Sequence, residues 1–284
     1  MVALSLGAVY SLIAVGFALI FGILNFSNFS HGVVMACGAF IGFFLIAEYG
    51  VHWIPSLLIT MVLTGLLALV IEFLAFRKLW TSGAPTIFLF VSSITVLMLI
   101  QNILTLMFRG DIWLFPAFME TMTIRMFGAT VATTQLLMFG VSIIILVTLT
   151  LFLRKTRVGI AITAAATDLK TCALMGVNVT MVIMYVFFIS GLIAGATGVF
   201  LGMTYTVNPL LGQMVLFGFI ATIIGGMGSL GGSVIGGFIL GGMQVIFTLT
   251  IGSALLPVGQ FSLILLFLLL RPHGILGRKI VDKV

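Results

Sequence analysis

The stretch ALSLGAVYSLIAVGFALIFGIL, residues 3–24, holds no charged side chain. About 20 apolar residues, each rising about 1.5 Å along a helix, cross the hydrocarbon core of a bilayer, which is about 30 Å thick. Further apolar runs follow at about 32–47, 54–76, 86–107, 134–153, 179–203, 212–226, 230–250 and 255–270. The sequence therefore predicts an all-α protein, a polytopic transmembrane helical bundle of about eight or nine spans.

The composition excludes a water-soluble protein. Of the 284 residues, 62% are hydrophobic and only 6% are charged, which is too little charge to solvate the surface of a soluble fold. We expect a single transmembrane domain over residues 1–284, with no room for a sizeable soluble domain. The formal net charge of +6 does not indicate nucleic-acid binding, because Lys and Arg collect in the cytoplasmic loops of membrane proteins.

The positions of the basic residues predict which loops face the cytoplasm. Clusters of Lys and Arg follow the apolar runs that end near residues 76, 153 and 270, whereas the opposite charges in the 108–133 loop cancel. The positive-inside rule then places 77–85, 154–178 and 271–284 in the cytoplasm and 108–133 outside.

The segment from Asn25 to Gly32 separates two apolar runs with side chains that are too polar to face lipid. One interpretation is a cytoplasmic turn, with Asn28 or Ser30 capping the next helix. The other is a lining of the solute path, because broken helices in transporters face protein or water. The candidate path residues here are Asn25, Asn28, Ser30 and His31. We expect His31 to be packed and hydrogen-bonded rather than a metal ligand, since no Cys or carboxylate spacing supports a metal site.

Two further polar features lie inside apolar runs. The adjacent amides Gln101 and Asn102 should face the interior of the bundle, either to hydrogen-bond another helix or to line the path. Glu72, near the cytoplasmic end of its run, can snorkel to the surface or pair with Arg77 or Lys78. The alternative role for Glu72 is that of a proton relay.

The predicted cytoplasmic segment 154–178 contains a short helix. Thr167 or Asp168 can cap its N-terminus, and Gly176 can take the left-handed conformation that ends a helix. Leu169, Cys172 and Ala173 would share one apolar face. This face could rest on the membrane or dock into a groove of a partner, and we favour docking because the short links to the neighbouring spans would hold the helix rigidly.

The glycine-rich segment 224–232 predicts a break between two spans, because each Gly in a helix costs about 1 kcal/mol relative to Ala. The predicted break residues are Gly225, Gly226, Gly228, Gly231 and Gly232. This segment is not a phosphate-binding loop, since no Lys follows a Gly to reach a phosphate. We expect no cofactor in this chain, and any ATP would be bound by another subunit.

At these residues the chain resembles the permease family of branched-chain amino acid ABC transporters, the LivH-like subunits. The resemblance rests on four stretches in the family's order: 7–17 with Phe21-Gly22; Asn28-Phe29-Ser30-His31-Gly32 with Gly38-Ala39; 157–178, which looks like the family's coupling loop; and 225–232.

The resemblance implies a non-enzymatic permease subunit of an ABC importer in the bacterial inner membrane. Together with a second, homologous permease it would form the path for branched-chain amino acids. Two cytoplasmic ATP-binding subunits and a periplasmic solute-binding protein would complete the system. The coupling residues that it implies, which would insert into a cleft of the ATPase, are Asp168, Leu169, Lys170, Thr171, Ala173, Leu174 and Gly176.

Three other functions are compatible with parts of the sequence. Permeases for urea or short-chain amides share the same pattern, so the solute is not determined by it. A self-sufficient secondary carrier would need ion-coupling groups in its spans, and Glu72 is almost the only candidate. An intramembrane enzyme would need a metal motif or a Ser/His pair placed within the spans, and none is recognisable.

Overall fold

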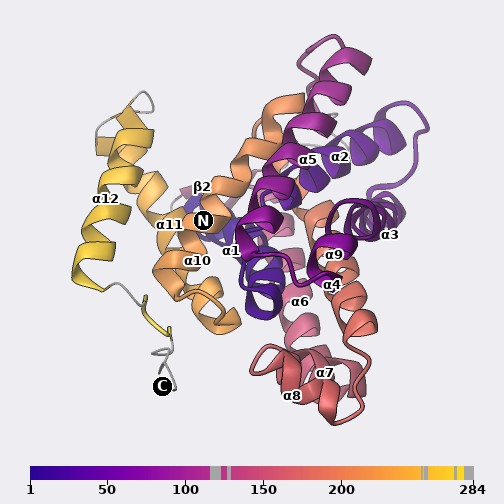
Figure 1. Cartoon of the computed structure of the whole chain (residues 1–284). Coiled ribbons are helices and arrows are strands. Elements are labelled where there is room, and N and C mark those ends of the chain that lie inside the picture. The colour runs from indigo at the N-terminus through magenta and orange to yellow at the C-terminus, as the bar shows by residue number, and fades with distance from the viewer. Residues whose placement is uncertain (116–122, 127–128, 251, 253–254, 272–273, 278–284) are drawn as a thin grey trace.

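The computed structural model describes residues 1–115, 123–126, 129–250, 252, 255–271 and 274–277, and nearly all of its regular structure is helical (Figure 1). The elements run in the order α1 (Val2–Leu24), α2 (Ser30–Ala47), α3 (Trp53–Ile71), the π-helix η1 (Glu72–Phe76), α4 (Arg77–Thr81), α5 (Thr86–Met107), β1 (Thr123–Met126), β2 (Ala129–Ala132), α6 (Thr133–Lys155), α7 (Arg157–Ala165), α8 (Leu169–Leu174), α9 (Val179–Thr204), the 3-10 helix η2 (Pro209–Met214), α10 (Val215–Gly225), α11 (Leu230–Thr250) and α12 (Leu256–Leu270).

The predicted apolar runs correspond closely to the observed helices, which confirms the helical transmembrane bundle. In the described part of the chain, seven helices are long and apolar enough to cross a bilayer. The run predicted at 212–226 is a shorter apolar helix, Pro209–Gly225, and the last run forms the short α12. The sequence did not predict the antiparallel β1–β2 hairpin, which lies in the 108–133 loop outside the helical bundle.

Helix α1 forms the centre of the bundle. It packs against α9, α10 and α11, and almost all of its side chains from Ser5 to Ile20 are buried. Glycines permit the close approach of these helices. A side chain on Gly237 would collide with the backbone of Ser11, and one on Gly198 would collide with the backbone of Met35. Small residues serve this purpose in membrane bundles, where van der Waals packing holds helices together.

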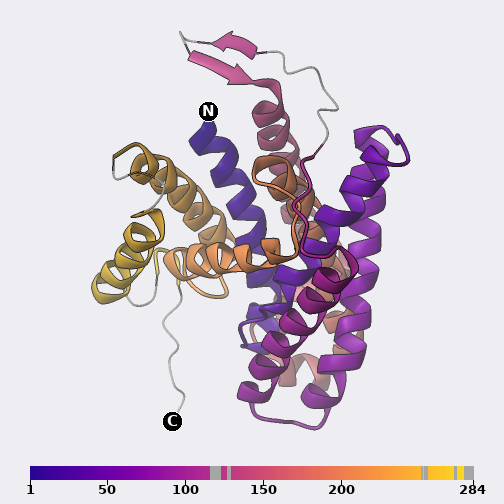
Figure 2. The same cartoon turned by 90° about the horizontal axis from the view of Figure 1, so that it is seen from above.

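The two ends of the bundle differ (Figure 2). The β1–β2 hairpin and the N-terminus lie at one end, and the turn 82–85 and helices α7 and α8 lie at the other. We call these the hairpin end and the α8 end. This arrangement agrees with the charge pattern, which predicts that 77–85 and 154–178 share one side of the membrane and 108–133 the other.

Candidate functional site

The α8 end carries a short helix with a well-formed N-terminal cap. Asp168 Oδ1 accepts hydrogen bonds from the backbone N–H of Lys170 (2.9 Å) and of Thr171 (3.1 Å), and the Thr171 hydroxyl donates to Oδ2 (2.5 Å). These hydrogen bonds lower the pKa of the Asp168 carboxyl from its ordinary value, and the bond from the Thr171 hydroxyl has the largest effect. Asp168 rather than Thr167 is therefore the cap, and Gly176 takes the predicted left-handed conformation with φ +82°.

The exposed face of α8 differs from the predicted one. Cys172 is buried and Leu169 is half-buried, because α8 packs on α7 and α9, while Ala173 is exposed. Most of the face formed by Leu169, Cys172 and Ala173 therefore packs against other helices of this chain and is not free to bind a partner. The free apolar surface instead comes from Leu174 and Met175, which are 87% and 80% exposed.

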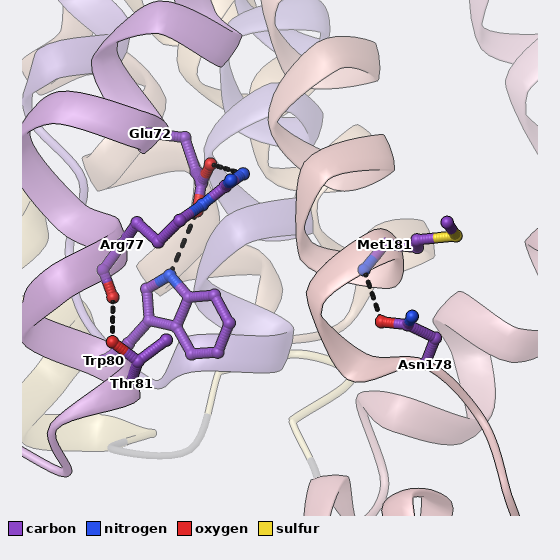
Figure 3. Close-up of polar contacts among 6 residues, drawn as sticks. All are labelled: Glu72, Arg77, Trp80, Thr81, Asn178 and Met181. Atoms are coloured by element: carbon purple, nitrogen blue, oxygen red, sulfur yellow. Dashed lines mark hydrogen bonds and ion pairs between the residues drawn. The ribbon is translucent and has the colours of Figure 1, made fainter.

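The segment that carries α8 leads directly into α9. The Asn178 side chain caps α9 by accepting from the backbone N–H of Met181 at 3.1 Å. Beside the start of α9 lies the end of α3, where a π-helical turn begins at Glu72 (Figure 3). The buried rings of Phe76, in this turn, and Phe187, in α9, pack 5.5 Å apart. Helix α8 therefore packs on α9, and α9 packs in turn on α3 and η1.

Glu72 is held by two side chains of the following turns (Figure 3). Arg77 Nη2 lies 2.6 Å from Glu72 Oε2, and Arg77 Nε and Trp80 Nε1 donate to Oε1 at 3.3 and 3.1 Å. Glu72 is fully buried, and Arg77 also lies over the ring of Phe73. The predicted pairing with Arg77 is confirmed, and Lys78 takes no part in this set of contacts. Because both carboxylate oxygens are occupied, the geometry favours a structural ion pair over a proton relay.

The polar segment between α1 and α2 forms a turn and also borders a cavity. Asn25 ends α1 in the left-handed conformation with φ 52°, and its side chain is exposed. Asn28 Oδ1 accepts from the backbone N–H of Ser30 (3.2 Å) and from its hydroxyl (2.6 Å), which closes the turn before α2. The N-cap residue of α2 is Phe29 and no side chain caps this helix, so the predicted cap by Asn28 or Ser30 is wrong. Three of the four candidate path residues are buried, namely Asn28, Ser30 and His31. Asn25 differs from them because it is exposed.

His31 is packed and hydrogen-bonded, as predicted. Its Nδ1 lies 3.0 Å from the hydroxyl of Ser190, which donates to the carbonyl oxygen of Gly16 at 2.9 Å. The contact joins α2, α9 and α1. Sequence reasoning missed Ser190, although a lone serine beside Gly191 in an apolar run is a signal of helix contact. In the described residues, no three His, Cys, Asp or Glu side chains gather as metal ligands.

The prediction that Gln101 and Asn102 face the interior is wrong for Asn102. The Asn102 side chain is exposed on α5 and donates from Nδ2 to the carbonyl oxygen of Met98, one turn earlier, at 2.7 Å. Gln101 is half-buried. The physical reason is that α5 lies at the edge of this chain and buries little of its surface.

A second buried polar cluster, which the sequence did not predict, lies toward the hairpin end. Tyr10 donates to Gln244 Oε1, Gln244 Nε2 donates to the Tyr205 hydroxyl (2.8 Å), and the two tyrosine hydroxyls lie 2.9 Å apart. Since the hydrogen of Tyr10 goes to Gln244, Tyr205 donates to Tyr10, and the three groups form a closed ring. Gln260 Nε2 adds α12 by donating to Gln244 Oε1 at 3.4 Å.

The glycine-rich segment forms the predicted break between two helices. Helix α10 ends at Gly225, Gly226 and Gly228 have φ of 108° and 81°, and α11 begins at Leu230. Gly232 packs against Gly225 across the turn, whereas Gly231 lies in open space. The turn also binds the chain near its C-terminus, because Ile275 N donates to Ile224 O and Leu276 N donates to Gly225 O, both at 2.9 Å.

Comparison with known proteins agrees with this architecture. A family model described as branched-chain amino acid transport system / permease component matches residues 2–271. The high-affinity branched-chain amino acid transport system permease protein BraD of Pseudomonas aeruginosa is 32% identical, over 99% of this chain and 95% of the relative. LivH of Salmonella typhimurium is 33% identical with the same coverage. A probable LivH of Methanocaldococcus jannaschii is 28% identical, over 94% of this chain and 88% of the relative. No solved structure matches the chain.

Proposed function

This chain belongs to the family of permease components of branched-chain amino acid transport systems, and from this premise we propose that it is one of two permease subunits in an ATP-driven importer of branched-chain amino acids. The observation that carries the proposal is the family match over residues 2–271, on a multi-pass helical bundle. The second permease is a related chain or another copy, and the solute path lies between the two. We place the complex in the bacterial inner membrane.

Coupling to ATP is proposed to pass through α8. Leu174 and Met175 are apolar, almost fully exposed and lie outside the spans, so they suit an apolar cleft on a cytoplasmic ATP-binding subunit. Lys170 is exposed on the same helix and can pair with an acidic residue of that subunit. ATP binds to the partner, and closure of the partner moves α8, α9 and α3 together as rigid helices.

Solute delivery is proposed to occur from the hairpin end. That end carries the 108–133 loop, which the charge pattern predicts to be external, so a periplasmic solute-binding protein would dock there. Selectivity then depends largely on the binding protein. The proposed solutes are leucine, isoleucine and valine. A secondary carrier is less well supported, because Glu72 is already paired with Arg77.

Purification and transport test the proposal together. The chain is affinity-purified from gently solubilised membranes, and the complex is reconstituted with the binding protein and ATP. We expect two ATP-binding subunits and a second permease to copurify, and labelled leucine to accumulate only with ATP. Accumulation of urea or acetamide instead would reassign the solute, and transport by the isolated chain without ATP would overturn the importer.

A matched pair of variants tests α8. Leu174→Asp places a charge where the apolar cleft is expected, so we expect uptake and retention of the ATP-binding subunits to fall about tenfold. Leu114→Asp makes the same change at an exposed site near the hairpin end and should leave subunit retention unchanged. Normal uptake and retention in Leu174→Asp would contradict the proposed role of α8.

A further inference from the structure

Among the described spans, helix α5 is the one that this chain covers least. It has 22 residues, and only 17% of its membrane-spanning stretch is buried. It packs against α2, η1 and η2, and its buried residues Leu89, Ser93 and Leu104 lie on one side of the helix. What covers the rest of α5 in the membrane therefore lies outside this chain.

A row of exposed residues runs along the opposite side of α5. Its members are Val91, Thr95, Met98, Asn102 and Thr105, which follow one another at intervals of four and three residues. Successive residues of an α-helix are turned by about 100°, so the row falls within an arc of about 80° that points away from the buried side. We call this row the α5 seam. Its spacing is that of a helix that packs against another helix along its length.

One member of the α5 seam has polar groups that its own helix does not satisfy. The hydroxyls of Thr95 and Thr105 each donate to a backbone carbonyl oxygen one turn earlier, at 3.0 and 2.9 Å. Asn102 also donates one Nδ2 hydrogen to its own helix, at 2.7 Å, and this is its only side-chain hydrogen bond in the described part of the chain. Because a carboxamide has two hydrogens to donate and two lone pairs, Oδ1 and the second Nδ2 hydrogen of Asn102 still need partners.

The position of Asn102 along α5 makes lipid a poor neighbour. At about 1.5 Å per residue, α5 is about as long as the hydrocarbon core of a bilayer is thick. Asn102 stands five residues before the last residue of the helix, which is about 7 Å inside that end. Lipid tails offer no hydrogen bonds, so an amide at this depth requires a polar partner.

Helix α3 shows how a lipid-facing span of the same chain differs. Its three polar residues, Ser56, Thr60 and Thr64, are all 0% exposed. Its exposed side chains are all apolar, with Leu58 and Val62 among them. Helix α3 thus keeps its polar groups inside the chain, whereas the α5 seam presents an amide on the outside. This contrast indicates that protein rather than lipid covers the α5 seam.

We propose that the α5 seam packs against the second permease subunit and that Asn102 hydrogen-bonds a polar side chain of that subunit. This inference rests on the proposed function, which supplies the second permease. A two-fold axis between two permeases brings the same helix of each to the contact. Where the second subunit is another copy, Asn102 meets Asn102 of that copy, and each amide can donate to the Oδ1 of the other. Such contacts hold helices together in membranes.

Cross-linking of the complete complex in native membranes tests the α5 seam. Met98→Cys places a thiol in the seam beside Asn102, and Val62→Cys places one on the exposed face of α3 as the matched control. A benzophenone maleimide is attached to each thiol and activated with light. We expect Met98→Cys to be joined to the second permease and Val62→Cys to lipid alone, as mass spectrometry would show. The parent chain, treated in the same way, controls for Cys37 and Cys172.

Three results would overturn the proposal. They are cross-links from Met98→Cys to lipid alone, equal cross-links to the second permease from both positions, and rapid modification of Met98→Cys by a membrane-impermeant maleimide. The last result would assign the seam to a water-filled solute path. Copurification of the second permease is scored separately. Its presence without a cross-link would reject the seam and leave the importer standing, whereas its absence would reject the importer.

Substitution of Asn102 tests the hydrogen bond itself. Asn102→Leu removes the amide, so we expect the amount of second permease retained in detergent to fall about fivefold. Asn102→Gln keeps an amide and should retain most of it. If lipid covered this face, leucine would suit the position at least as well as asparagine. Unchanged retention in Asn102→Leu would therefore contradict the proposed contact.

Discussion

The α8 end and the hairpin end of this bundle both bury polar side chains among apolar helices, but the two clusters are completed in different ways. Toward the hairpin end, Tyr10, Tyr205 and Gln244 form a closed ring of neutral groups that satisfy one another. Toward the α8 end, an ion pair holds Glu72, His31 Nε2 has no hydrogen-bond partner among the residues that the structure describes, and α8 presents an exposed apolar tip.

The two clusters show two roles that polar or exposed groups have in a membrane protein. The members of the closed ring satisfy one another, and with the added bond from Gln260 the ring ties α1, α9, α11 and α12 together. Exposed groups acquire their partners from outside the chain, as proposed for the ATP-binding subunit at α8. The hairpin end is therefore expected to be the more rigid of the two, and the α8 end the more responsive to bound molecules.

The largest expected effect comes from breaking the ion pair at the α8 end. Glu72→Ala leaves Arg77 with an uncompensated charge and Trp80 without its acceptor, so the free energy of unfolding should fall by about 2–3 kcal/mol. Unfolding in mild detergent measures this. Glu48→Ala, at an exposed site, should change stability by less than about 0.5 kcal/mol. Equal stability of the two variants would show that the Glu72 pair contributes nothing.

Opening the neutral ring should cost less than breaking the ion pair. Gln244→Leu removes the hydrogen bonds to Tyr10, Tyr205 and Gln260, and we expect a loss of about 1–2 kcal/mol, since interhelical hydrogen bonds in membranes are individually weak. The exposed Gln213→Leu is the matched control. If the ring acts as a unit, Tyr10→Phe should add little to Gln244→Leu. Full additivity would argue for independent bonds.

The open cluster should tolerate the loss of a hydroxyl better than the closed ring does. Ser190→Ala is expected to lower the free energy of unfolding by only about 0.5 kcal/mol, because it removes one neutral hydrogen bond between helices, and such bonds are individually weak in membranes. The same unfolding assay compares it with Gln244→Leu. A loss from Ser190→Ala as large as that from Gln244→Leu would remove the distinction between the two clusters.

The smallest effect concerns the cap of α8 and its response to pH. The pKa of Asp168 is lowered in the folded chain, so its cap stabilises α8 above the ordinary carboxyl pKa and is lost as the pH falls through the lowered value. Hydrogen exchange at the Lys170 and Thr171 amides should therefore lose protection in acid. Asp168→Asn, which can still cap but does not titrate, should abolish this pH dependence. The same acid response in Asp168→Asn would assign it to another group.

Features that depend on neighbouring residues could be predicted from the sequence. The Asp168 cap, the left-handed Gly176 and the break at 225–232 are each decided within one or two helical turns. The pairing of Glu72 with Arg77 follows equally from their short separation along one helix. The roles of these residues in transport, in contrast, remain predictions that the experiments above address.

Features that depend on which face of a helix meets another helix could not be predicted. Asn102 was expected inside and is exposed, and Cys172 was expected on a free face and is buried. The partners of Tyr10 and His31 lie far away in the sequence, in α9 and α11. Because these spans are apolar on every side, their sequence pattern does not indicate which side faces protein and which faces lipid.

The sequence by itself determined the class of protein and the positions of its spans, because the thickness of the bilayer and the cost of burying charge act on each segment separately. Only the tertiary structure decided which polar groups meet and which of them close into a ring. These outcomes depend on the distances between helices, which small residues and packed side chains set jointly across the whole bundle.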